Sequence, residues 1–80
     1  MFPIGIMNIT NTEQLGVAVR RQRKHLGVTQ KELAMVCGTG LRFIVDVEKG
    51  KPTCQIGKIF QVLQALGLNL DMASGSDKLQ

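Results

Sequence analysis

Glycines at positions 27, 38, 50 and 67 each follow a short segment whose apolar residues recur at helical spacing. A glycine directly after such a segment is typical of a helix C-terminus. The chain is therefore predicted to form four helices, over residues 10–26, 30–37, 41–49 and 54–66. With 80 residues in all, the sequence has room for one domain with one hydrophobic core. The predicted fold class is all-α, a compact four-helix domain.

The helix starts carry signals of their own. Thr10 with Glu13 and Thr29 with Glu32 each have the spacing of a capping box, in which the first side chain accepts from the third amide. Pro52 and Thr53 mark the start of the fourth helix. That helix is expected to turn one apolar face inward, built from Ile56, Ile59, Phe60, Leu63 and Leu66.

The two ends of the chain differ from the helical middle. Residues 1–9 read as a short apolar arm in which alternate positions (Phe2, Ile4, Ile6) fit a strand. Residues 68–72 alternate apolar and polar side chains and are predicted to form a half-buried strand. Residues 73–80 are small and polar and are predicted to be a disordered tail. The domain proper is thus placed at residues 10–67.

The charge is concentrated in the middle of the chain. Residues 20–51 hold eight Lys or Arg and three Asp or Glu, a local charge of +5 that fits a surface for a polyanion. With three Phe and neither Trp nor Tyr, the chain lacks the aromatic residues of a single-strand stacking platform. The apolar start is too short to span a membrane or act as a signal peptide, so a soluble cytoplasmic protein is expected.

The sequence gives little support for an enzyme or a metal-binding protein. Cys37 and Cys54 lie inside apolar helical patterns and lack the close spacing of a zinc site, and His25 is expected at the surface. Paired carboxylates in an apolar setting, a Gly-rich phosphate loop and a nucleophile motif are all missing from the sequence. We therefore expect no catalytic residue, metal or cofactor.

The spacing from Gln30 to Val47 is the most specific pattern in the chain. Ala34 follows Gln30 by four residues, and Gly38 follows Ala34 by four. Two helices that cross steeply through a tight turn need a small residue at the crossing, and the turn itself needs a residue that tolerates positive φ. Ile44 and Val47, three apart, place an apolar stripe of the later helix on the earlier one. The other faces of the later helix then point away from the body.

This pattern, extended by Glu48, Gly50 and Lys51, resembles the Cro/repressor-type (XRE) helix-turn-helix family. With the flanking helices the resemblance covers about residues 13–67. It implies a protein that binds double-stranded DNA, with the helix at 41–49 in the major groove.

The resemblance assigns contacts with bases to residues near the start and on the outer face of that helix: Leu41, Arg42, Phe43 and Asp46. Arg42 fits guanine O6 and N7, a contact worth roughly 1–3 kcal/mol of discrimination. Each assignment has an alternative. Arg42 is otherwise a solvated charge, and Leu41 and Phe43 are otherwise buried against a dimer partner or the N-terminal arm. Asp46 either accepts from cytosine N4 or pairs with Arg42, four residues away.

The resemblance also assigns contacts with the DNA backbone to Gln30, Lys31, Lys49 and Lys51. Gln30 and Lys31 open the second helix, where free amides and the helix dipole favour a phosphate. Arg23 and Glu48 resemble an ion pair that fixes the orientation of the helices in this family.

After Gly67 the sequence departs from simple family members, which continue with another helix. The predicted strand instead resembles the HipB-type antitoxin branch, which dimerises partly by pairing such strands and binds a HipA-type kinase toxin. The resemblance implies a homodimer held in part by Leu68, Leu70 and Met72. The function it implies is a repressor acting on a pseudo-palindromic operator and serving as an antitoxin. The alternative is a protein-interaction module that neutralises a toxin kinase with little DNA binding of its own.

Overall fold

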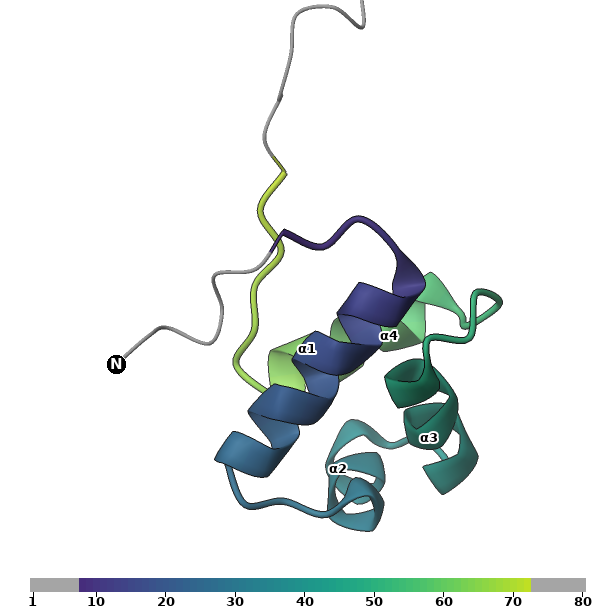
Figure 1. Ribbon diagram of the computed structural model, residues 1–80. Coiled ribbons are helices and arrows are strands. Elements are labelled where there is room, and N and C mark those ends of the chain that lie inside the picture. Colours follow the sequence, from purple (N-terminus) through teal and green to yellow (C-terminus); the bar gives the residue numbers. More distant parts are fainter. Residues whose placement is uncertain (1–7, 73–80) are drawn as a thin grey trace, which may run out of the picture.

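The computed structural model describes residues 8–72, and these form four helices (Figure 1). They are α1 (Thr12–His25), α2 (Gln30–Cys37), α3 (Leu41–Lys49) and α4 (Ile56–Ala65). Helix α1 packs against α3, α3 against α2, and α2 against α4. No strand is formed within residues 8–72. The all-α four-helix architecture predicted from the sequence is confirmed.

The first helix begins later than its Thr10 signal predicts. Asn11 is the N-cap, and its side-chain oxygen accepts from the Gln14 amide at 2.8 Å. Thr10 instead donates its own amide to the side chain of Gln14, at 2.6 Å. The prediction of a Thr10 capping box is therefore wrong, because Asn caps a helix as well as Thr does and stands one residue further on.

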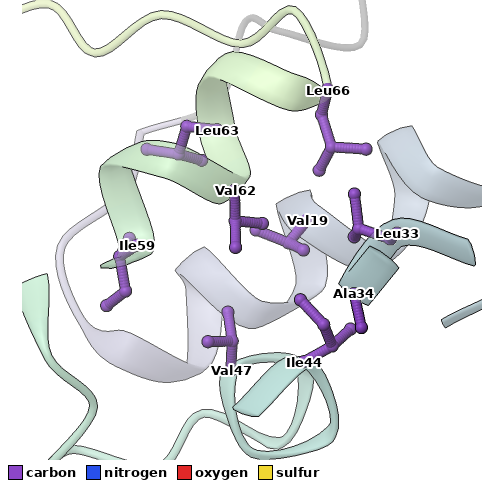
Figure 2. Close-up of a cluster of buried hydrophobic side chains, with 9 residues drawn as sticks. All are labelled: Val19, Leu33, Ala34, Ile44, Val47, Ile59, Val62, Leu63 and Leu66. Carbon is purple, nitrogen blue, oxygen red and sulfur yellow. The ribbon is translucent and has the colours of Figure 1, made fainter. Parts of the chain in front are cut away.

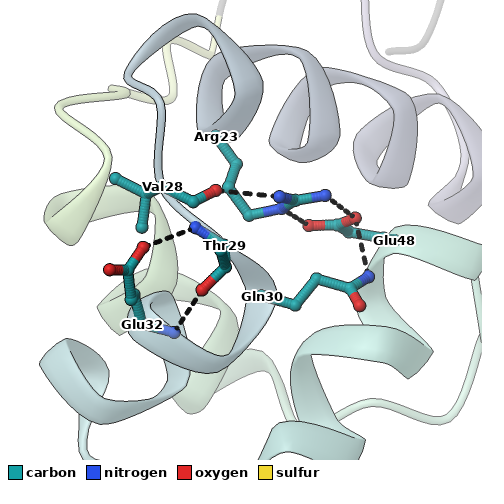
Figure 3. Close-up of polar contacts among 6 residues, drawn as sticks. All are labelled: Arg23, Val28, Thr29, Gln30, Glu32 and Glu48. Atoms are coloured by element: carbon teal, nitrogen blue, oxygen red, sulfur yellow. Dashed lines mark hydrogen bonds and ion pairs between the residues drawn. The ribbon is translucent and has the colours of Figure 1, made fainter.

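The helix-turn-helix unit, α2 and α3, has the bounds that the sequence predicts. Thr29 accepts from the Glu32 amide at 3.0 Å, and the Glu32 carboxylate accepts from the Thr29 amide at 2.9 Å. This is the predicted second capping box (Figure 3). Gly38 ends α2 with φ of 70°, the left-handed conformation that favours glycine. Its conformation turns the chain sharply toward α3.

The core lies where the four helices meet, and Figure 2 shows its side chains facing one another. Ile44 and Val47 of α3 are buried against α2, as the spacing of the motif predicts. The full set is Val19, Leu33, Ala34, Ile44, Val47, Ile59, Val62, Leu63 and Leu66. Because α3 uses two adjacent turns of one face for this core, its opposite face is left free for another partner.

The fourth helix departs from its prediction in both start and face. It begins at Ile56 rather than Cys54, and no side chain caps it. Ile56 and Phe60 are exposed, by 62% and 46%, whereas Val62 is fully buried. At 100° per residue, Ile56 and Phe60 lie on the edge of the apolar stripe, while Val62 continues the face of Ile59 and Leu66. Helical spacing therefore identifies the helix but misplaces the centre of its buried face.

The segment after Gly67 runs on without pairing to another segment of the described chain. The Leu68 amide donates to the Leu63 carbonyl at 2.8 Å, and the Leu68 side chain is half-buried against the core. Leu70 and Met72 are exposed, Met72 by 98%. The predicted strand at 68–72 needs a partner strand, so it stays a prediction. The strand pattern at 2–6 and the tail at 73–80 lie outside the described residues.

Candidate nucleic-acid interface

Helix α3 presents a mixed polar face on the side opposite its two core residues. Ile44 and Val47 fix the inward direction, and successive residues turn by 100°. The outward side consequently carries Arg42, Val45, Asp46 and Lys49. The Arg42 side chain is 85% exposed. A helix with a free face of this kind has the dimensions to enter the major groove of B-DNA.

Leu41 and Phe43 flank this face. Leu41, the first residue of α3, is 47% exposed. Phe43 is half-buried against the core, and Lys58 Nζ of α4 lies 5.7 Å from its ring centroid, within the range of a cation–π interaction. Phe43 is thus turned toward α4, at the edge of the outward face.

Asp46 is held by two cations of the same chain. Arg42 Nε lies 3.4 Å from Asp46 Oδ1, and Lys51 Nζ lies 3.5 Å from Asp46 Oδ2. The pair with Arg42 is one of the two alternatives that the sequence leaves open. Both ion pairs reduce the repulsion between this carboxylate and an approaching phosphate, because the acid is neutralised locally.

A buried ion pair joins α1 to α3 beneath the interface (Figure 3). Arg23 is 8% exposed and donates from Nε and Nη2 to the Glu48 carboxylate, at 2.6 and 3.1 Å. Its Nη1 donates to the Val28 carbonyl at 2.8 Å. These are the two residues that the resemblance pairs. Three bonds from one planar group hold the start of α2 in a fixed direction relative to α3.

Gln30 is tied into the same network. Its Nε2 donates to Glu48 Oε1 at 3.1 Å, which fixes the side chain at the first turn of α2. Lys31, Lys49 and Lys51, the other residues assigned to backbone contacts, are exposed. Lys31 and Gln30 stand at the positive end of the α2 dipole. Two of these residues contact α3 directly: Gln30 bonds to Glu48 of that helix, and Lys51 pairs with its Asp46.

Two open clefts flank α3, and cations line both. The α1–α3 cleft has a volume of about 500 Å³ and takes its charged side chains from Arg20, Arg23, Lys24, Glu48 and Lys49. The α3–α4 cleft has a volume of about 250 Å³ and takes its charged side chains from Asp46, Lys51 and Lys58. The two sugar–phosphate strands that border a major groove run on either side of an inserted helix, which matches this arrangement.

Lys58 is a cation beside α3 that the sequence does not single out. It lies on α4, far from the helix-turn-helix motif in sequence, yet it lines the α3–α4 cleft beside Lys51. The packing of α4 beside the motif is needed to bring it to α3.

The two thiols are free in the structure. Burial raises the pKa of the Cys37 thiol. The pKa of the Cys54 thiol is also raised, mainly by burial and to a smaller extent by the negative charge of the nearby Asp46. Both thiols therefore remain protonated at neutral pH.

Among residues 8–72, His, Cys, Asp and Glu side chains form no cluster of three or more that could hold a metal ion. Within the same residues, no helix is both long and apolar enough to cross a lipid bilayer.

Comparison with known proteins decides the family. A helix-turn-helix family model matches residues 19–72, two thirds of the chain and the whole motif. The chain belongs to the helix-turn-helix family. An uncharacterized HTH-type transcriptional regulator of Sinorhizobium fredii, y4mF, is 50% identical over 70 residues, which are 88% of this chain and 92% of that protein. The XRE-type membership predicted from the sequence is confirmed.

Solved structures of HipB are similar to this helix-turn-helix protein along most of its length. A HipB–O4 20-mer complex has a TM-score of 0.81 and 27% identity, and the match covers 89% of this chain and 100% of that one. A HipA–HipB–O2–O3 complex gives the same four values. The protein is thus a DNA-binding transcriptional regulator with a HipB-like fold, and its family is not a class of enzymes.

Proposed function

We propose that this helix-turn-helix protein is a homodimeric repressor that reads a pseudo-palindromic operator with α3. The observation that carries the proposal is the free face of α3, with Arg42 exposed on it and a cation-lined cleft on each side. The likeness to a HipB–O4 20-mer complex supports the same mode of binding.

Arg42 is proposed as the principal reader of sequence. Its guanidinium is well exposed and suits the O6 and N7 acceptors of guanine. Its partner Asp46 orients it in the free protein and, once Arg42 has turned to guanine, accepts from cytosine N4, while Leu41 and Val45 contact thymine methyl groups. Phe43, at the edge of the face, makes the outermost base contact. Gln30, Lys31, Lys49 and Lys51 bind phosphates.

A homodimer brings two such helices to successive turns of one DNA face. The required spacing between recognition helices is roughly 34–36 Å. The segment 68–72 supplies apolar side chains that remain exposed in the single chain, Leu70 by 47% and Met72 by 98%. Pairing of this segment across a twofold axis covers both residues, with Leu68 at its base.

We further propose that the protein acts in the cytoplasm as an antitoxin, bound to a HipA-type kinase toxin. The likeness to HipB in a HipA–HipB–O2–O3 complex, over 89% of this chain, supports this role. Co-purification with a HipA-type kinase in the presence of operator DNA tests it. If the kinase does not stay bound to the immobilised protein and its kinase activity is not reduced, the antitoxin role is excluded, whereas the proposed repression is unaffected.

The experiment that tests operator binding is selection from a random duplex library, followed by sequencing of the retained DNA. We expect an enriched pseudo-palindrome with a guanine in each half-site. Arg42→Ala is expected to relax the guanine preference by roughly 1–3 kcal/mol. Arg21→Ala, an exposed arginine on α1, serves as the matched control and keeps the preference. Retention of DNA without an enriched sequence would contradict sequence-specific repression.

A further inference from the structure

The α1–α3 cleft gathers cations that the helix-turn-helix motif does not contain. Arg20 and Lys24 enter it from α1, and Lys49 enters it from α3. Arg20 and Lys24 are four residues apart, so they lie on the same side of α1. The cleft also borders Thr29 and Gln30, the N-cap and the first residue of α2, where the helix dipole is positive. Positive groups of three helices therefore converge on one space of about 500 Å³.

The negative charge of the cleft is already neutralised. Glu48 is the one carboxylate among its lining residues, and it accepts two bonds from Arg23 and one from Gln30. Arg20, Lys24 and Lys49 form no ion pair with any residue from 8 to 72. The cleft thus has an excess of three positive charges that face solvent, a charge that attracts an anion.

The nature of the side chains indicates which anion. Arg20, Lys24 and Lys49 are long and exposed, so they are suited to phosphates along a polymer rather than to a small anion enclosed by buried donors. Lys49 and Val45 also belong to the outward half of α3, which makes the cleft continuous with the surface proposed to face the bases.

We propose that the α1–α3 cleft binds a backbone phosphate of the operator, held by Arg20 and Lys24 together with Lys49 and the first turn of α2. The inference rests on the proposed DNA-binding function and extends its footprint to α1. Arg20 and Lys24 are then direct contacts with the DNA backbone.

The salt dependence of operator binding tests this contact. Each phosphate contact contributes about 0.9 to the slope of log K against log of the salt concentration. Arg20→Ala and Lys24→Ala are each expected to reduce the slope, by up to about two for a dimer in which each subunit loses its hold on one phosphate. Arg21→Ala removes the same charge from the neighbouring position, which does not line the cleft, and is expected to leave the slope unchanged.

A second arm locates the phosphate on the DNA. Methylphosphonate substitution removes one phosphate charge at a time along the operator, and one position is expected to weaken wild-type binding about tenfold. The same substitution should weaken Arg20→Ala less than it weakens the wild type, because Lys24 and Lys49 still line the cleft in that variant. Circular dichroism confirms that each variant is folded.

The outcomes separate this inference from the proposed function. If the wild type binds no operator, the DNA-binding proposal fails first. If the wild type binds and all three variants keep its slope, only the cleft contact is wrong. An equal loss in Arg21→Ala would show a general field effect and would also overturn the contact. Tight binding of inorganic phosphate to the DNA-free protein, with unchanged slopes, would assign the cleft to a free anion instead.

Discussion

Gly16 lies in the middle of α1, where glycine is normally unfavourable by about 1 kcal/mol relative to alanine. The reason for it is the approach of α3. A Cβ atom at this position would lie 2.5 Å from the Val47 carbonyl oxygen and 2.7 Å from that of Glu48. Both obstacles are backbone atoms, which cannot move aside as a flexible side chain can. Gly16 therefore allows α1 and α3 to pack at the distance that brings Arg23 to Glu48.

We predict that Gly16→Ala destabilises the protein, although alanine is the better helix former. Overpacking of this kind is worth about 1–3 kcal/mol, and the gain in helix propensity offsets only about 1 kcal/mol of it. Urea unfolding followed by circular dichroism measures the difference in the free energy of unfolding. Gly57→Ala is the matched control, because Gly57 also lies within a helix but a Cβ atom there would have nothing within 4 Å. It should stabilise by up to about 1 kcal/mol, and equal signs for both variants would contradict the packing explanation.

The sequence does not reveal the role of Gly16. A glycine inside a helical pattern reads as a weak point of that helix, and the atoms that exclude a side chain belong to a helix about thirty residues further on. The burial of Val62 is likewise not evident from the sequence. Its helical position is compatible with either edge of the apolar stripe, and the packing of α4 on α2 decides that it is buried instead of Phe60.

At the scale of the element, the start of α2 depends on the protonation of Glu32. The Thr29 amide donates to the Glu32 carboxylate and its hydroxyl lies nearby, and these contacts lower the pKa of Glu32 below its ordinary value. The charged carboxylate also interacts favourably with the positive end of the α2 dipole. Because the folded pKa is the lower one, this stabilisation is present above the ordinary pKa of 4.5 and is lost as the pH falls through the folded value.

We predict that Glu32→Gln reduces stability at neutral pH and has a shrinking effect as the medium becomes acidic. Glutamine retains an oxygen that can accept from the Thr29 amide but lacks the charge. The difference in urea midpoint between the two proteins should narrow from pH 5 toward pH 3. A gap that stays constant over this range would show that the charge of Glu32 does not contribute to the cap.

The sequence predicts the bounds of a helix well when residues next to those bounds determine them. Helices α2 and α3 have the predicted bounds because a capping box, Gly38 and Gly50 act within a few residues of each boundary. Helix α4 has no side-chain cap, so the sequence places its start two residues too early. The two clefts beside α3 require residues from three separate helices, and Lys58 joins them only through the tertiary packing.

At the scale of the whole molecule, the surface has two features that point to different partners. Cations surround the outward face of α3, whereas apolar side chains are exposed along the segment after α4. The first surface attracts a polyanion, and the second is stabilised when an apolar partner surface covers it. The two surfaces are coupled if the protein is a dimer, since two weakly bound half-sites then act as one operator site.

We predict that Leu70→Lys weakens the homodimer and, through it, the affinity for the operator. Burial of one leucine is worth about 1.5–3 kcal/mol, so its loss from both subunits should raise the dimer dissociation constant more than tenfold. A lysine on an edge strand also disfavours strand pairing. Sedimentation equilibrium at micromolar concentration measures the first effect, and operator binding at the same salt concentration measures the second.

The matched control for Leu70→Lys is Met35→Lys, which makes a similar change at a residue that is 72% exposed on α2. Met35 lies outside the segment proposed to pair, so its variant should keep both the dimer and the operator affinity. A dimer that survives Leu70→Lys would exclude pairing through residues 68–72 but leave dimerisation through another surface open. A wild type that is monomeric at micromolar concentration would exclude the dimer itself, and α3 would then have to read a single half-site.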